Sequence, residues 1–223
     1  MPRRCLIALV LAILFAGWRA APALEPQTEQ TAYDNLPDPR LVTILKGIAS
    51  KAGRSDVFPQ DGRYVYDLVL KNNLTSGLEI GTANGYAAIW VGMAFGQTRG
   101  RLVAIEASKE QGREALARLE QAEQLDHVDL LLDDPFKVIP MLTGPYDFVF
   151  LDGKKQDYEK CLTLLLPRVR PGGFIVAHNV ADQSRELAGF IRKITGDPQL
   201  KTELVTISSA GMSVTQKRAG SRQ

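Results

Sequence analysis

Polar residues stand directly after two short apolar runs in the second half of the chain. Asp152 follows the run Tyr146–Leu151, and His178 with Asn179 follows the run Gly173–Ala177. If these runs are neighbouring parallel strands, their carboxyl ends meet at one edge of the sheet and the three side chains converge. A carboxylate, an imidazole and an amide then offer the oxygen and nitrogen donors of a divalent-metal site.

Lys155 lies one helical turn beyond Asp152. An amine beside a cation has a lowered pKa and can accept a proton, so Lys155 is a candidate general base for a bound hydroxyl group. An isolated Asp-x-x-Lys sequence is more often solvated than catalytic, and a lone histidine is more often a core residue than a metal ligand. These residues therefore need support from the rest of the chain.

A glycine turn earlier in the chain indicates a cofactor pocket. The apolar run Leu78–Ile80 stops at Gly81, and Gly81 and Gly85 bracket a turn into a predicted helix. Glycine lets the backbone adopt conformations closed to other residues and lets a ligand approach closely. The Glu-x-Gly-x-x-x-Gly spacing differs from the Gly-x-Gly-x-x-Gly of dinucleotide-binding proteins, which argues against a pyrophosphate ligand. Glu106 ends the next apolar run, where a carboxylate can accept hydrogen bonds from a ribose diol, so we predict a ribose-bearing cofactor.

The elements that must position these residues alternate between strand and helix. This alternation predicts an α/β fold with a mostly parallel sheet covered by helices on both faces. The last two strands are joined by residues 208–211 only, so they should form a hairpin at one edge. The predicted strands are 78–80, 103–105, 128–132, 146–151, 173–177, 202–207 and 212–215. The predicted helices are one from Pro39, one that contains Val65, Leu68 and Val69, and those over 85–95, 108–125, 136–142, 157–166 and 182–194, with 57–62 as a loop.

Composition limits the function classes. A chain of 223 residues with 45% hydrophobic residues suits one sizeable α/β domain. The net charge of +2 and the scattered basic residues give no sign of a nucleic-acid partner. The two cysteines, Cys5 and Cys161, form neither a disulfide framework nor a metal-binding spacing, and Cys161 is expected to be a buried apolar residue.

The N-terminal segment has the pattern of an export signal. Arg3 and Arg4 precede an apolar run from Cys5 to Trp18, and small residues around Ala23 allow cleavage before Leu24. Residues 1–23 are therefore expected to be a signal peptide, giving a periplasmic or secreted domain, or an uncleaved membrane anchor. We expect residues 24–38 to be a linker, 39–217 the domain and 218–223 a tail.

Four motifs together resemble the cation-dependent class I O-methyltransferases. These are the S-adenosylmethionine enzymes that include catechol and caffeoyl-CoA O-methyltransferases. The resemblance covers about Pro39 to Lys217, with the motifs in family order and at family spacing. It implies a seven-stranded Rossmann-like sheet with a reversed last strand, and a homodimer. The motifs are Leu78–Tyr86, Phe150–Lys155, Leu166–Gly173 and Val176–Val180.

The resemblance also implies roles for individual residues. Glu106 would hold the ribose hydroxyls, Asp134 and Phe136 would flank the adenine, and Lys155 would be the general base. A divalent metal such as Mn²⁺ or Mg²⁺ would bind two adjacent substrate oxygens and lower a hydroxyl pKa. The implied cofactor-binding residues are Glu79, Gly81, Gly85, Tyr86, Glu106, Asp134, Phe136 and Asp152. The implied metal ligands are Asp152, His178 and Asn179, and the implied catalytic residues are Lys155 and Asp152.

Two features depart from the family pattern. The family usually has Asp-Asn where this chain has His178-Asn179, which favours a softer ion or indicates that metal binding is lost. S-adenosylmethionine is made in the cytosol, so the export signal leaves the supply of cofactor unexplained and keeps a cytoplasmic location open.

We predict an O-methyltransferase acting on a small catechol-like or vicinal-diol acceptor, with metal assistance. One alternative is an exported, noncatalytic protein that keeps the nucleoside pocket. Another is an aminopropyltransferase-like enzyme that uses a decarboxylated cofactor, for which the pair Asp133-Asp134 offers slight support.

Overall fold

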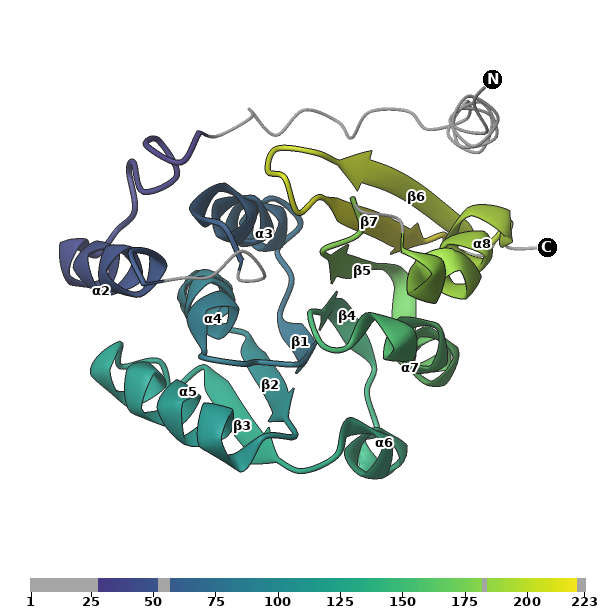
Figure 1. Ribbon diagram of the computed structural model, residues 1–223, viewed down its shortest axis with the longest axis horizontal. Coiled ribbons are helices and arrows are strands. Elements are labelled where there is room, and N and C mark those ends of the chain that lie inside the picture. Colours follow the sequence, from purple (N-terminus) through teal and green to yellow (C-terminus); the bar gives the residue numbers. More distant parts are fainter. Residues whose placement is uncertain (1–27, 52–56, 182–183, 220–223) are drawn as a thin grey trace, which may run out of the picture.

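The protein is described by a computed structural model that covers residues 28–51, 57–181 and 184–219. A seven-stranded sheet forms its centre, in the order β3-β2-β1-β4-β5-β7-β6 (Figure 1). β1 to β5 run parallel, whereas β7 is antiparallel to both β5 and β6. The predicted parallel sheet, its reversed last strand and the terminal hairpin are therefore confirmed. The strands are β1 Ser76–Ile80, β2 Arg101–Glu106, β3 Val128–Leu132, β4 Tyr146–Leu151, β5 Val169–His178, β6 Leu200–Val205 and β7 Met212–Lys217.

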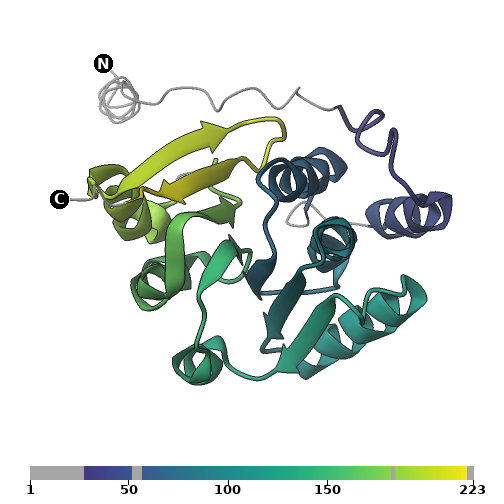
Figure 2. The same cartoon turned by 180° about the vertical axis from the view of Figure 1, so that it is seen from behind.

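Helices cover both faces of the sheet, which is why its central strands are mainly apolar. All six residues of β4 are buried. Phe148 and Phe150 face the core beneath α3 and α4, whereas Val149 and Leu151 face the core beneath α7 and α8. Figure 2 shows the same two layers from behind. The α-helices are α2 Pro39–Ala49, α3 Pro59–Lys71, α4 Tyr86–Thr98, α5 Lys109–Gln121, α6 Pro135–Val138, α7 Tyr158–Leu165 and α8 Ala188–Gly196. The 3₁₀ helices are η1 Ile139–Met141, η2 Lys155–Asp157, η3 Leu166–Arg168 and η4 Arg185–Leu187.

The loop predicted over residues 57–62 is partly wrong, because α3 already begins at Pro59. Proline suits the first position of a helix, where its fixed φ is favourable and its missing N–H is not needed. Asp61 and Gly62 therefore lie in the first turn of α3 and are buried. A Cβ atom on Gly62 would lie 2.4 Å from the ring of Trp90, so glycine allows α3 to approach α4 closely.

Residues 28–38, part of the predicted linker, pack against the domain. Tyr33 stacks on Trp90 of α4 with 5.8 Å between ring centroids, and its hydroxyl lies 3.2 Å from that of Tyr86. Arg63 of α3 donates hydrogen bonds to two backbone carbonyls of this segment. The segment is thereby fixed to α3 and α4 before α2 begins.

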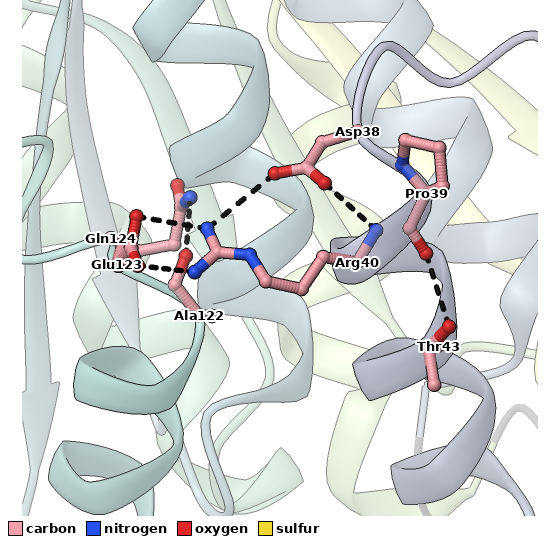
Figure 3. Close-up of polar contacts among 7 residues, drawn as sticks. All are labelled: Asp38, Pro39, Arg40, Thr43, Ala122, Glu123 and Gln124. Atoms are coloured by element: carbon pink, nitrogen blue, oxygen red, sulfur yellow. Dashed lines mark hydrogen bonds and ion pairs between the residues drawn. The ribbon is translucent and has the colours of Figure 1, made fainter.

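An ion pair joins the start of α2 to the loop after α5 (Figure 3). Asp38 caps α2 by accepting a hydrogen bond from the backbone N–H of Arg40 at 2.8 Å. The Arg40 guanidinium binds the Glu123 carboxylate with both of its terminal nitrogens. Both side chains are exposed, so solvent screening leaves the pair a small contribution to stability. Its effect is mainly to orient α2.

The predicted leader and its cleavage site fall within residues 1–27, outside the described residues, and remain predictions. Within the described ranges, every helix is too short or too polar to span a bilayer. The helix predicted over 182–194 is described from Ser184, where η4 leads into α8. Cys161 is buried on α7, as expected.

Candidate active site

A cavity of about 880 Å³ opens at the carboxyl ends of β1, β2 and β4. The strand order reverses between β1 and β4, and ligands of open α/β sheets bind at such a point. Most of the residues predicted for the site line this cavity: Gly81, Tyr86, Glu106, Asp134, Phe136, Asp152, Lys155 and Asn179. Three predicted residues do not line it, namely Glu79, Gly85 and His178.

Gly81 and Gly85 shape the turn between β1 and α4. Both have positive φ angles, of 88° and 85°, which glycine adopts without strain. A Cβ atom on Gly81 would lie 2.6 Å from the Cα atom of Gly153, so the loops after β1 and β4 touch through two glycines. Gly85 is the N-cap of α4 and lies against Ala115 of α5. Gly81 therefore forms part of the cavity wall, and Gly85 supports that wall from behind.

Glu79 is fully buried behind the wall. One carboxyl oxygen accepts a hydrogen bond from the Thr82 hydroxyl at 2.9 Å, and the other, Oε1, has no hydrogen-bond partner. Burial raises the pKa of Glu79 to about 8, with smaller contributions from Asp152 and Glu106. Glu79 is therefore mainly neutral at pH 7 and supports the glycine turn from beneath.

Glu106 joins two loops of the cavity wall. Its carboxylate accepts hydrogen bonds from the backbone N–H of Ala83 at 2.8 Å and of Ser108 at 2.7 Å. Each carboxylate oxygen can accept more than one hydrogen bond, so Glu106 can also accept from a hydroxyl in the cavity. This arrangement suits the ribose-binding role that the sequence predicts.

The far end of the cavity is formed by the residues after β3. Asp134 caps α6 by accepting a hydrogen bond from the backbone N–H of Phe136 at 2.8 Å. The Lys160 ammonium of α7 lies 3.6 Å from the centroid of the Phe136 ring, which is a cation–π contact. The ring is thereby held in place at the cavity wall, where it offers an apolar surface to a flat ligand.

Asp152 and His178 meet because β4 and β5 are paired, with Leu151 opposite Ala177. Nδ1 of His178 lies 2.9 Å from Oδ1 of Asp152, and Nε2 lies 3.0 Å from Oδ2 of Asp61. The Ser208 hydroxyl donates a hydrogen bond to the same Asp61 oxygen at 2.6 Å. His178 and Asp61 are fully buried, whereas the Asp152 side chain is 13% exposed. We refer to Asp61, His178 and Asp152 as the buried clamp.

The two carboxylates determine the charge of His178. Burial alone would lower the pKa of the imidazole, but Asp152 and Asp61 outweigh this effect and raise the pKa to about 9. His178 is therefore an imidazolium at pH 7 and donates a hydrogen bond to each carboxylate. Sequence reasoning missed Asp61 and Ser208, because they come from α3 and from the loop between β6 and β7.

The donor set does not fit the metal ion that the family resemblance implies. Asp152 and Asn179 line the cavity, but His178 lies behind its wall with both ring nitrogens directed at carboxylates. A ring nitrogen binds a metal through its lone pair, and here carboxylate oxygens lie 2.9 and 3.0 Å from the two nitrogens, in the positions that an ion would take. Across residues 28–51, 57–181 and 184–219, no group of three histidine, cysteine, aspartate or glutamate side chains is arranged to hold a metal. This geometry does not favour His178 as a metal ligand, and its role in metal binding stays a prediction.

Comparisons with known proteins agree with the fold and the cavity. A family model described as a methyltransferase domain matches residues 78–180. A catechol O-methyltransferase of Mycobacterium tuberculosis is 30% identical over 64% of this chain and 66% of its own length. A catechol O-methyltransferase of Niastella koreensis is 29% identical over 59% of this chain and 61% of its own length. The chain thus spans slightly less than two thirds of these relatives.

A solved structure of similar fold contains a cofactor product. The O-methyltransferase from Bacillus cereus in complex with SAH superimposes with a TM-score of 0.72 at 26% identity. The match covers 85% of this chain and 96% of that protein. The cavity described above therefore belongs to a fold that holds S-adenosylhomocysteine in a relative.

Proposed function

We propose that this chain, a member of the class I O-methyltransferase family that includes the catechol and caffeoyl-CoA enzymes, methylates a hydroxyl group of a small catechol-like acceptor. The observation that carries the proposal is one continuous cavity. It joins the wall residues Gly81, Glu106 and Phe136, which suit a nucleoside, to Asp152 and Lys155, which suit a hydroxyl acceptor.

The chain's own residues divide the cavity between two ligands. Glu106 would hold the ribose hydroxyls of the cofactor, and Phe136, at the cavity wall, would bind its adenine. S-adenosylmethionine supplies a methyl group on a sulfonium, which is electrophilic without further activation. Most of the rate enhancement then comes from holding the acceptor oxygen in line with that methyl group.

Lys155 and Asp152 act on the acceptor hydroxyl. Lys155, on η2 after β4, receives the hydroxyl proton at its Nζ atom as the oxygen–methyl bond forms. The Asp152 carboxylate, fixed at its Oδ1 atom by His178, lines the same cavity and accepts the hydrogen bond of the hydroxyl before its proton passes to Lys155. The balanced products are a methyl ether, S-adenosylhomocysteine and a protonated Lys155.

A product assay tests this function. The purified chain is incubated with S-adenosylmethionine and catechol, and the methyl ether and S-adenosylhomocysteine are quantified by mass spectrometry. We expect both products in a ratio of one to one, and Asp152→Ala should abolish them while S-adenosylmethionine still binds in calorimetry. Failure of the wild-type chain to bind S-adenosylmethionine would overturn the proposal.

A matched control uses a charged residue outside the site. Lys71 is exposed at the end of α3 and lies outside the cavity wall. We expect Lys71→Met to leave both products at the wild-type level. Binding of S-adenosylmethionine without any methyl ether, from catechol or from simple phenols, would favour a noncatalytic nucleoside-binding protein.

A further inference from the structure

We propose that methyl transfer by this chain needs no metal ion, because a hydrogen bond from His178 of the buried clamp holds the Asp152 carboxylate in place, as a bound metal would otherwise do. It follows that the acceptor class is phenols in general, and that a second, adjacent hydroxyl is not required. This inference rests on the proposed function, and it assigns to His178 the role of a positioning residue.

The first argument concerns the two ring nitrogens of His178. Each lies within 3.0 Å of a carboxylate oxygen, one on Asp61 and one on Asp152. A nitrogen ligand lies about 2.0–2.1 Å from an ion such as Zn²⁺, and these carboxylates occupy the directions in which an ion would have to lie. Both ring nitrogens therefore already face a carboxylate oxygen, in either tautomer and in the protonated form of the ring.

The second argument concerns the depth of the clamp. His178 and Asp61 are both fully buried, and neither lines the cavity. The Ser208 hydroxyl donates to Asp61 at 2.6 Å and ties the clamp to the loop between β6 and β7. Turning the ring toward the cavity would remove the His178 hydrogen bond from the fully buried Asp61 carboxylate, whose other oxygen, Oδ1, already has no hydrogen-bond partner, and this is costly. The ring is therefore held in its present orientation.

The third argument concerns the charge that remains for an ion in the cavity. Of the three residues implied as metal ligands, only Asp152 and Asn179 line the cavity, and Asn179 is uncharged. The Oδ1 atom of Asp152 already accepts a hydrogen bond from His178. An Mg²⁺ or Mn²⁺ ion would have to share one carboxylate with the imidazole, which is a poor site for a hard dication.

The consequence for the acceptor follows from chelation. A bound metal selects vicinal diols because both oxygens coordinate it. Without the metal, the reacting hydroxyl is held by Asp152 and Lys155 only. The second hydroxyl of catechol then contributes one ordinary hydrogen bond at most, so kcat/KM for phenol should lie within about tenfold of that for catechol.

The experiment uses the full chain after removal of metals with a chelator. Methyl transfer to catechol and to phenol is measured with excess EDTA, and then with added Mn²⁺ or Mg²⁺. In parallel, Mn²⁺ is titrated into the complex with S-adenosylmethionine and followed by electron paramagnetic resonance. We expect equal rates with and without EDTA and no stoichiometric Mn²⁺ binding. Loss of activity in EDTA that Mn²⁺ restores, or Mn²⁺ binding at one site that Asp152→Asn removes, would overturn the inference.

Two sets of variants separate positioning from folding. His178→Gln should lower kcat at least tenfold while KM for S-adenosylmethionine stays within threefold, because the cofactor wall does not include this residue. The double variant Asp61→Asn/His178→Asp supplies a second carboxylate beside Asp152 without burying a third. We expect it to bind Mn²⁺ and to become sensitive to EDTA, with Asp61→Asn alone as the control that stays insensitive. A folded double variant that binds no Mn²⁺ and stays insensitive to EDTA would show that residue 178 does not determine whether the site binds a metal. That result would overturn the role assigned to His178.

The two proposals fail in distinguishable ways. Methyl transfer that depends on Mn²⁺ leaves the proposed function intact and rejects the metal-free mechanism. If no acceptor is methylated under any condition, the proposed function fails, and the Mn²⁺ titration still decides whether Asp152, His178 and Asn179 hold a metal.

Discussion

The two halves of the cavity are built in different ways. The half assigned to the cofactor includes hydrogen bonds within one strand–helix–strand unit, such as that from the Ala83 N–H to Glu106, 23 positions further along the chain. The half assigned to the acceptor depends on the buried clamp, in which Asp61 lies 117 positions from His178 and 147 from Ser208.

The difference separates a half positioned within one strand–helix–strand unit from a half positioned by the packing of distant segments. The turn at Gly81 and the Glu106 carboxylate depend on backbone geometry that few substitutions allow. On the acceptor side, a histidine at position 178 is tolerated because Asp61 supplies a buried counter-charge.

The largest effect is expected for Lys155→Met in the acceptor half. Loss of the proposed general base should lower kcat by about 10²–10⁴-fold. The dissociation constant of S-adenosylmethionine, measured by calorimetry, should change little, because the two halves bind separate ligands. A comparable loss of both would mean that the halves are not independent.

Gly81→Ala should distort the turn between β1 and α4 in the cofactor half of the cavity. The added Cβ would lie 2.6 Å from the Gly153 Cα atom at a φ of 88°, so the turn must shift. We expect a loss of about 1–3 kcal/mol in the free energy of unfolding, measured with urea, and weaker cofactor binding. Gly47→Ala, where an added Cβ meets nothing within 4 Å, is the control and should leave both quantities unchanged.

The pH dependence of stability should distinguish the two halves. The pKa of Glu79 rises from 4.5 to about 8 on folding, so its contribution is full below pH 4.5 and is lost as the pH rises toward 8. The pKa of His178 rises from 6.5 to about 9, so its contribution is full below pH 6.5 and is lost through about pH 9.

Urea unfolding from pH 4.5 to 10 measures these two contributions. Glu79→Gln should flatten the decline below pH 8, and Asp61→Asn should flatten the part that continues toward pH 9. The exposed Glu120→Gln serves as a control and should follow the wild-type curve. If Glu79→Gln also declines steeply between pH 5 and 8, Glu79 is not the group responsible.

The smallest effect is expected for Lys160→Met. The ammonium lies 3.6 Å from the Phe136 ring centroid, and an exposed cation–π contact contributes about 0.5–1 kcal/mol. Affinity for S-adenosylmethionine should therefore fall by about two- to fivefold in calorimetry, with kcat nearly unchanged. Unchanged affinity would mean that the ring is held in place without Lys160.

The cofactor half was predictable from the sequence because its main residues lie in one continuous segment of the chain. Leu78–Ile80 ends at Gly81, and the next strand ends at Glu106, so a single strand–helix–strand unit places both. Alternating strands and helices also predicted the mostly parallel sheet and the final hairpin. The boundaries were less certain, as β5 shows by starting at Val169 and not at Gly173.

The buried clamp was not predictable for a physical reason. Asp61 precedes an apolar stretch that includes Tyr64 and Val65, and no periodicity shows which distant residue its carboxylate will meet. An aspartate in the first turn of a helix that begins with proline is common at the surface. Only the packing of α3 near the end of β5 makes it the partner of His178.

The attachment of residues 28–38 has a practical consequence for handling the protein. Because Arg63 and Trp90 hold this segment, any polypeptide or surface joined ahead of residue 28 connects to the domain at a defined point beside α3. A fluorophore or immobilisation tag placed there would report on the domain with little independent motion. Cutting the chain after Asp38 would instead remove Tyr33, and with it the hydroxyl partner of Tyr86 and the ring stacked on Trp90.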